Sequence, residues 1–273
     1  MADMTADYAG AGESLGVGKI IGDTFGIFFK RIVQIISLGF IITFATMALS
    51  GLIVGFDMVA GSGDPLAGPE VVGAMDVVGI FLMLLLQFAG YGLLIGAMVL
   101  LAYDAKLGRS ARTGTYIKAA LSNIIPISIL TLIVTVIAMI GFFLFVIPGL
   151  WIYAMLSVFV PAIVVERAGF KALGRSRSLT KDYRWPIVGL MIVLGLIMFV
   201  LSLALVLIIG LPIGLLFAAG GDGTMGILAS LITQALASGI SYGLAAIPIA
   251  LIYARLREIK EGVSVDSMAD VFK

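Results

Sequence analysis

The sequence predicts an all-α integral membrane protein with six transmembrane helices in three parallel repeats, each preceded by a basic amphipathic cytoplasmic helix. The 273 residues are 61% apolar and only 12% charged, whereas soluble domains have roughly 45–50% apolar and about 25% charged residues. The apolar residues form long uncharged runs, and these must be helical because lipid offers the backbone no hydrogen-bonding partner. The basic residues fall only in alternate connections between the runs.

The first segment, residues 1–12, is expected to be a disordered cytoplasmic lead-in, because the amino terminus lacks the basic and apolar regions of a cleaved signal peptide. An amphipathic helix is expected to follow from Glu13 and to lie at the membrane interface. Its apolar face consists of Ile21, Phe25, Phe28, Phe29 and Ile32, and its polar face carries Lys19, Asp23 and Lys30.

A single six-helix transmembrane domain is expected over residues 13–262, followed by a short cytoplasmic tail at 263–273. Most of its uncharged runs reach the length that a hydrocarbon layer of about 30 Å requires, and the fourth is shorter. The expected crossings are residues 34–56, 77–102, 125–147, 150–165, 186–208 and 225–254.

Prolines and glycines mark the breaks between and within these crossings. Pro148 and Gly149 predict a tight turn between the third and fourth crossings, and Pro161 falls inside the short fourth one. The far end of the fifth run is interrupted by Gly210, Pro212 and Gly214. This interruption is read as either a kink or a broken helix.

Charge decides the orientation. All 17 Lys and Arg residues lie before the first crossing, after the second, after the fourth or after the sixth. The other connections contain only acidic charges. This is the positive-inside pattern and places both termini in the cytoplasm.

The repeats are inferred from the basic segments that precede the first, third and fifth crossings. Each is long enough for a helix. The second begins as DAKLGRSARTGTYIKAALSN (104–123) and again places Ile117, Leu121 and Ile124 on one face. Three parallel units related by an axis along the membrane normal would explain this pattern. The alternative is that any six-crossing protein obeying the positive-inside rule has alternating basic loops.

Enzymatic chemistry has no candidate residues in this sequence. The absence of Cys and His removes thiol chemistry, thiolate or imidazole metal sites and histidine general-base catalysis, and no cofactor or metal is expected. The crossings contain no Asp, Glu, Lys or Arg, which argues against an ion-coupled transporter. Their polar side chains include Gln87, Thr131, Thr135, Gln234, Ser238, Ser241 and Tyr242.

Two kinds of residue in the crossings are expected to make contacts between helices of the same domain. Gln87 and Gln234 are expected to form hydrogen bonds between helices. The small-residue pairs Gly92/Gly96 and Gly239/Gly243 are expected to let helices approach within the domain rather than to form a dimer interface.

The basic segment after the fourth crossing, here named the basic exit (residues 166–185), is the largest cationic cluster in the chain. Near an anionic membrane surface each Lys or Arg contributes up to about 1 kcal/mol of attraction, although these charges could also serve only to fix topology. The residues predicted to contact headgroups or a partner are Arg167, Lys171, Arg175, Ser176, Arg177, Thr180, Lys181, Arg184 and Trp185.

Residues 147–185 have the sequence IPGLWIYAMLSVFVPAIVVERAGFKALGRSRSLTKDYRW. This stretch resembles the bacterial YciC-like inner-membrane family. It is also similar to the membrane domain of membrane-anchored glycerophosphodiester phosphodiesterases. The resemblance covers most of residues 13–265, implies a six-helix domain of the bacterial inner membrane, and emphasises Arg175, Ser176 and Thr180. The catalytic domain of those phosphodiesterases uses histidines, which this sequence lacks, so their activity is not carried over.

The sequence therefore favours a non-enzymatic multi-pass inner-membrane protein that acts as a scaffold or as a membrane-homeostasis or assembly factor. Its expected partners are anionic membrane lipids and another membrane protein or complex, with no nucleic acid. The alternative is a passive transporter or channel for a small or lipid-like solute, which requires a cavity between the crossings.

Overall fold

A computed structural model describes residues 14–61, 73–205, 207–208, 211–212 and 223–263. Regular structure within these residues is helical throughout, without a strand. Six stretches are long and apolar enough to cross a membrane, which confirms the prediction of an all-α, multi-pass membrane protein. They are Ile32–Val54, Ala74–Lys106, Ile124–Leu144, Val146–Glu166, Arg184–Ala204 and Thr224–Glu261.

The fourth span is built from two helices, whereas each of the others follows one helix. The helices are α1 (Val17–Lys30), α2 (Ile32–Val54), α3 (Phe56–Ala60), α4 (Ala74–Lys106), α5 (Thr113–Leu121), α6 (Ile124–Leu144), α7 (Val146–Leu156), α8 (Phe159–Glu166), the 3₁₀ turn η2 (Gly169–Lys171), α9 (Ala172–Thr180), α10 (Arg184–Leu205) and α12 (Thr224–Glu261).

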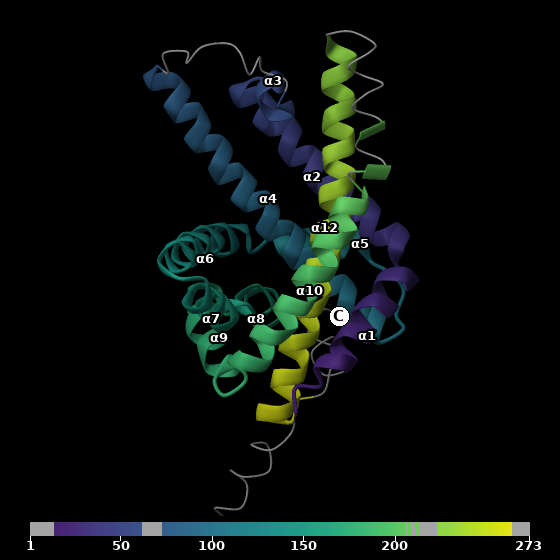
Figure 1. The fold of residues 1–273 in the computed structure, drawn as a ribbon, viewed down its shortest axis with the longest axis vertical. Helices are drawn as coiled ribbons and strands as arrows, with labels where there is room; N and C mark the ends of the chain where they lie inside the picture. Colours follow the sequence, from purple (N-terminus) through teal and green to yellow (C-terminus); the bar gives the residue numbers. More distant parts are fainter. Residues whose placement is uncertain (1–13, 62–72, 206, 209–210, 213–222, 264–273) are drawn as a thin grey trace, which may run out of the picture.

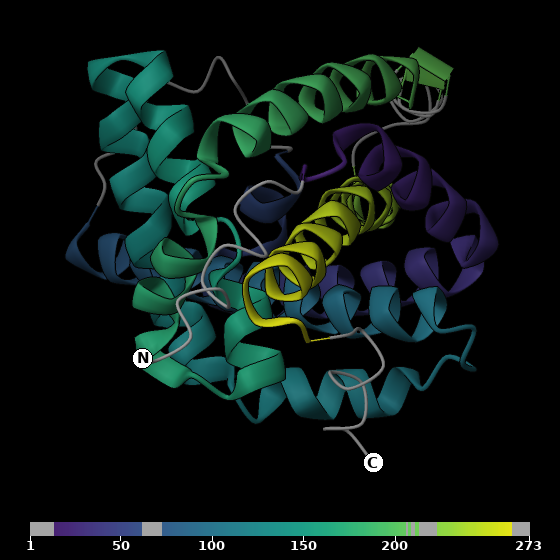
Figure 2. The same ribbon diagram turned by 90° about the horizontal axis from the view of Figure 1, so that it is seen from below.

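The long helix α12 runs along the longest axis of the molecule, and α2 and α4 lie beside it (Figure 1). Towards the top of this view α4 diverges from α12, whereas lower down the helices converge. Helix α6 is seen nearly end-on in Figure 1 and lengthwise in Figure 2, so it crosses α4 instead of running parallel to it. The short helices α1, α5, α8 and α9 gather around the lower half, here named the charged end.

Glycines bring the long helices into direct backbone contact. A Cβ atom added at Gly39 of α2 would lie 2.5 Å from the Cα of Gly239 on α12, and one at Gly243 would lie 2.3 Å from the Ile35 side chain. A Cβ at Gly92 of α4 would likewise come within 2.3 Å of Ile127 on α6. The prediction that the small-residue pairs serve internal packing is therefore confirmed.

Both predicted polar contacts between helices are also present. The Gln87 amide of α4 donates to the Ser50 hydroxyl of α2 over 3.3 Å. The Gln234 amide of α12 donates to the Ala60 carbonyl of α3 over 3.3 Å. These bonds satisfy polar groups that lipid could not satisfy.

The turn predicted at Pro148 and Gly149 lies elsewhere. The chain turns at Phe145, which has extended backbone angles, and Pro148 and Gly149 belong to the first turn of α7. Proline is tolerated there because the first N–H groups of a helix have no intrahelical acceptor. Gly149 instead allows close packing of α7 on α6, since a Cβ there would lie 2.7 Å from the Phe142 nitrogen.

Pro161 was expected inside a continuous helix, but it too stands in a first helical turn. It is the third residue of α8, directly after the chain breaks at Ser157 and Val158. A proline at 161 cannot donate to the Ser157 carbonyl four residues earlier. The fourth span therefore divides into α7 and α8 at this position.

The face that α1 buries differs by one position from the predicted one. Its buried residues are Ile20, Thr24, Ile27 and Phe28, while Phe29 remains 67% exposed. The three-repeat arrangement stays a prediction. The lead-in at 1–12, most of the tail at 263–273, and Gly210 and Gly214 lie outside the described residues.

Candidate functional site

The basic exit starts where α8 ends. Arg167 follows Glu166 with a left-handed backbone (φ 53°) that reverses the chain. After η2 the chain enters α9 and then reaches α10, which begins at Arg184. The segment therefore wraps the charged end of the α7–α8 pair instead of extending away from it (Figure 1).

Ser176 and Thr180, predicted as surface contacts, are fully buried. Both hydroxyls donate to the Met155 carbonyl, at 2.9 and 3.0 Å, and Ser176 Oγ accepts the Val158 N–H at 3.3 Å. Their role is therefore corrected: they satisfy backbone groups that the break between α7 and α8 leaves without helical partners.

Arg175, also predicted to face headgroups, points into the protein. Its guanidinium donates to both Glu166 oxygens, at 2.7 and 2.8 Å, and pairs with Glu261 at 2.5 Å. These carboxylates raise the pKa of Arg175 further above its ordinary value. Glu166 also accepts the Tyr253 hydroxyl at 2.5 Å, and Arg257 lies 3.5 Å from it.

We name this group the Glu166 network. It contains two acids, two arginines and one tyrosine, and it ties α8 and α9 to the end of α12. The charges balance within the group, so Arg175 is a structural cation rather than part of an open basic surface.

The other predicted contacts remain at the surface. Arg184 is half-buried and its guanidinium lies 4.4 Å from the Trp151 ring, as in a cation–π contact. Trp185 is 63% exposed and the neighbouring Phe170 is 59% exposed. The exposed cations of the segment are Arg167, Lys171, Arg177 and Lys181.

A second carboxylate, at the end of α4, is held in a similar way. Asp104 is only 4% exposed. It accepts from the Arg112 guanidinium at 3.2 Å and from the Tyr116 hydroxyl at 2.6 Å. Burial, followed by this hydrogen bond, raises the pKa of Tyr116 to about 12. We name these three residues the Asp104 clamp.

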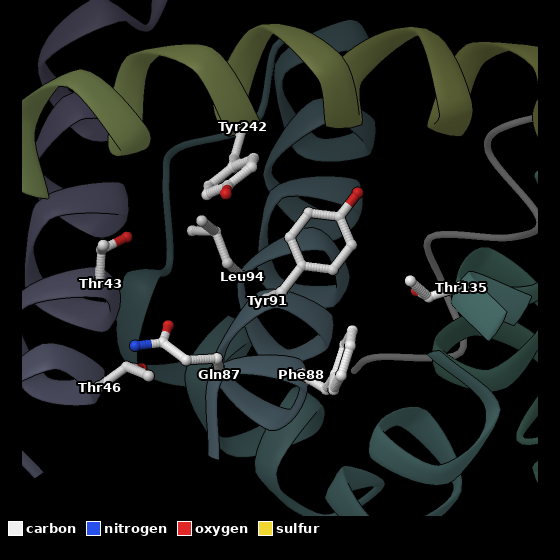
Figure 3. Close-up of a pocket in the computed structure, with 9 residues that line it drawn as sticks. Thr43, Thr46, Gln87, Phe88, Tyr91, Leu94, Thr135 and Tyr242 are labelled. Carbon is white, nitrogen blue, oxygen red and sulfur yellow. The ribbon is translucent and has the colours of Figure 1, made fainter. Parts of the chain in front are cut away.

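A polar cavity of about 400 Å³ lies away from the charged end, between α2, α4, α6 and α12. Thr43 and Thr46 contribute from α2 and Tyr242 from α12, while Gln87 and Tyr91 stand on α4 between them (Figure 3). The remaining lining residues are Phe88, Gly90, Leu94 and Thr135. Because these residues are central in their helices, the cavity lies near the middle of the predicted crossings.

A smaller inner cavity of about 70 Å³ shares Tyr91 and Thr135 with the first. It reaches α7 and α8 through Tyr153 and Phe159. Thr131 also lines it and is 3% exposed, and its Oγ1 atom has no hydrogen-bonding partner in the part of the chain that the structure describes.

Sequence reasoning identified some of these lining residues but not the cavity. Gln87, Thr131, Thr135 and Tyr242 were recognised as polar groups within crossings, whereas Tyr91, Thr43 and Thr46 were missed. The sequence contained a pattern that could have predicted these lining residues. Residues 87 and 91 are four apart and residues 43 and 46 are three apart, which is the spacing of neighbours on a helix. Each pair therefore occupies one helix face.

Among the described residues there is no cluster of acidic side chains that could hold a metal ion. The lining of both cavities consists of uncharged residues. Comparisons with protein-family models, with curated proteins and with solved structures find no match to this chain.

Proposed function

We propose that this chain is a non-enzymatic protein of the bacterial inner membrane whose basic exit docks on anionic lipid headgroups at the cytoplasmic face. In this role it serves as a scaffold or assembly factor for a membrane partner. The observation that carries the proposal is that four cations of the basic exit and Trp185 are all exposed.

Electrostatics support this role. Each exposed cation near an anionic leaflet contributes about 1 kcal/mol, and tryptophan favours the headgroup level of a bilayer. Arg175 is not among the contacting groups, because Glu166 and Glu261 neutralise it. The YciC-like resemblance, which implies a bacterial inner-membrane domain, agrees with this location.

The test is a triple variant in which Lys171, Arg177 and Lys181 are each changed to Gln. We expect the phosphatidylglycerol and cardiolipin that co-purify with the protein to fall at least about tenfold, because three favourable charges are removed. The measurement is quantitative mass spectrometry of lipids retained after mild detergent purification, together with recovery of co-purifying proteins.

The matched control changes Lys19, Lys30 and Lys118 to Gln, which removes the same number of exposed charges from other segments. If both triple variants lose anionic lipid equally, or neither loses any, the basic exit has no special role in headgroup binding.

A second candidate is passive passage of a small or lipid-like solute, which the polar cavity near mid-span favours. A cavity lined by uncharged residues is suited to a neutral solute rather than an ion. Flux of such a solute into protein-containing vesicles, compared with empty vesicles, tests this candidate. Flux equal in the two preparations would eliminate it.

A further inference from the structure

The polar groups of the two cavities lie where the surrounding crossings are apolar. Gln87 and Tyr91 project from the middle of α4, and Tyr242 approaches them from α12, with its ring centroid 5.1 Å from that of Tyr91 (Figure 3). In lipid such groups are costly unless they are satisfied. The side-chain N–H of Gln87 donates a hydrogen bond to the Ser50 hydroxyl. The side-chain carbonyl oxygen of Gln87 can accept a hydrogen bond from a ligand.

The side chain of Thr131 also points to a ligand, independently of Gln87 and Tyr242. Its hydroxyl is buried against the smaller cavity, which shares Tyr91 and Thr135 with the larger one, and it lacks a hydrogen-bonding partner among the described residues. A buried hydroxyl without a partner is unfavourable. A ligand oxygen that reached the inner cavity would satisfy it.

The chemistry of the lining restricts the ligand. Amide and hydroxyl groups both donate and accept hydrogen bonds, and the lining contains no Asp, Glu, Lys or Arg. A charged headgroup would therefore lose its hydration without gaining a counterion, which is strongly unfavourable in a medium of low dielectric constant. A neutral group with hydroxyl or ester oxygens matches this lining.

The size and surroundings of the cavity restrict the ligand further. About 400 Å³ accommodates a small polar head but not a whole lipid with its chains. Exposed apolar side chains lie one helical turn from the lining, at Leu84 before Gln87 on α4 and at Leu49 after Thr46 on α2. Acyl chains could remain against these side chains while the head occupies the cavity.

We propose that the cavity formed by Thr43, Gln87, Tyr91, Thr135 and Tyr242 binds the uncharged, hydroxyl-bearing head of a diacylglycerol-like lipid. Thr131, in the smaller cavity on the other side of Tyr91 and Thr135, forms a hydrogen bond with a ligand oxygen that extends past these two residues. This inference rests on the cavity and not on the basic exit. It also names the ligand class that the passive-transport candidate would move, although binding does not depend on transport.

The test uses vesicles of phosphatidylethanolamine and phosphatidylglycerol that contain a photoactivatable diacylglycerol with its reactive group close to the glycerol. After illumination, cross-linked peptides of the full chain are mapped by mass spectrometry. We expect labelling at residues 87–94 and near Tyr242, with displacement by unlabelled diacylglycerol. A photoactivatable phosphatidylglycerol should not label these peptides.

The double variant Gln87→Leu, Tyr242→Phe should lower this labelling at least about tenfold, since two hydrogen bonds are lost. Gln234→Leu is the matched control, because it removes a mid-helix glutamine amide that bonds to Ala60 outside the cavity. Labelling that is equal in the double variant and the wild type, or stronger labelling by phosphatidylglycerol, would overturn the proposal.

Thr131→Val provides a second test that preserves side-chain shape. It should lower labelling severalfold while leaving the melting temperature of lipid-free protein unchanged or higher, because an unsatisfied hydroxyl is removed. Unchanged labelling in this variant would contradict the role of Thr131. The Lys171, Arg177 and Lys181 triple variant should be labelled like the wild type, which separates this proposal from the headgroup proposal.

Discussion

The charged end and the middle of the crossings differ in how their buried polar groups are satisfied. At the charged end most of these groups have protein partners, with Arg184 Nε as the exception among the described residues. At the charged end, Arg175, Ser176 and Asp104 each have hydrogen-bonding partners at normal distances within the protein. In the middle of the crossings Thr131 has none, and Gln87 faces a cavity. Buried polar groups normally have partners, so the middle region is where an external ligand has most to contribute.

Residues within the charged end also serve two different purposes. The segment with the most basic residues contains three side chains that hold the fold, Arg175, Ser176 and Thr180, between cations that remain exposed. A segment rich in basic residues can therefore contain both residues that hold the fold and residues that form the surface. Only the contacts of each side chain show which role it has.

The largest expected effect comes from disrupting the close backbone contact between α2 and α12. Gly39→Val introduces side-chain atoms where even a Cβ would lie 2.5 Å from the Gly239 backbone. We expect a loss of at least about 3 kcal/mol of stability, because overpacking at backbone cannot be relieved by a rotamer change. The measurement is the detergent-solubilised melting temperature and the yield of monodisperse protein.

Gly195→Val on α10 is the control, because nothing lies within 4 Å of a Cβ at this position. If Gly39→Val and Gly195→Val melt at the same temperature, the glycine contact does not hold the middle of the bundle together.

An intermediate effect is expected from the Glu166 network. Glu166→Gln removes the charge shared by Arg175 and Arg257 and weakens the Tyr253 hydrogen bond. The side chain is 21% exposed, so solvent screening reduces the loss to about 2 kcal/mol of unfolding free energy. Hydrogen exchange should increase at the end of α12, and denaturation in a mild detergent measures the free energy.

Glu258→Gln is the comparison for this change, since Glu258 is 54% exposed and pairs with Arg255 three residues earlier. We expect it to cost less than about 0.5 kcal/mol. Equal losses in the two variants would show that the Glu166 network is no more than surface charge.

The smallest effect is expected at the Asp104 clamp. Tyr116→Phe removes two hydrogen bonds, the one that the hydroxyl donates to Asp104 and the one that it accepts from the Arg112 N–H, and we expect a cost of about 1.5 kcal/mol near neutral pH. The pKa of Tyr116 is raised from 10.0 to about 12 in the folded protein. A group whose pKa rises on folding stabilises the protein below its unfolded pKa. The advantage of wild type over Tyr116→Phe should therefore decline between pH 10.0 and about 12.

Unfolding experiments on wild type and Tyr116→Phe across this pH range measure that difference, and ultraviolet titration of tyrosine ionisation provides the second readout. A difference that stays constant up to pH 12 would contradict the assigned titration of Tyr116.

Part of this arrangement followed directly from residue patterns. The hydrogen bonds of Gln87 and Gln234 and the packing of Gly239 and Gly243 were predictable, because lipid leaves such groups few partners other than neighbouring helices. The position of the turn at Phe145 was not predictable from Pro148 and Gly149. A proline suits both a turn and a first helical turn.

The sequence by itself determined that the chain is helical and multi-pass, because the length and composition of its apolar runs allow no other way to satisfy the backbone in lipid. Only the tertiary structure decided that Arg175 faces Glu166 and that Thr131, Gln87 and Tyr242 line two cavities with shared walls. These outcomes depend on contacts between helices far apart in the chain. Periodicity along one helix specifies which residues share a face, but not what that face meets.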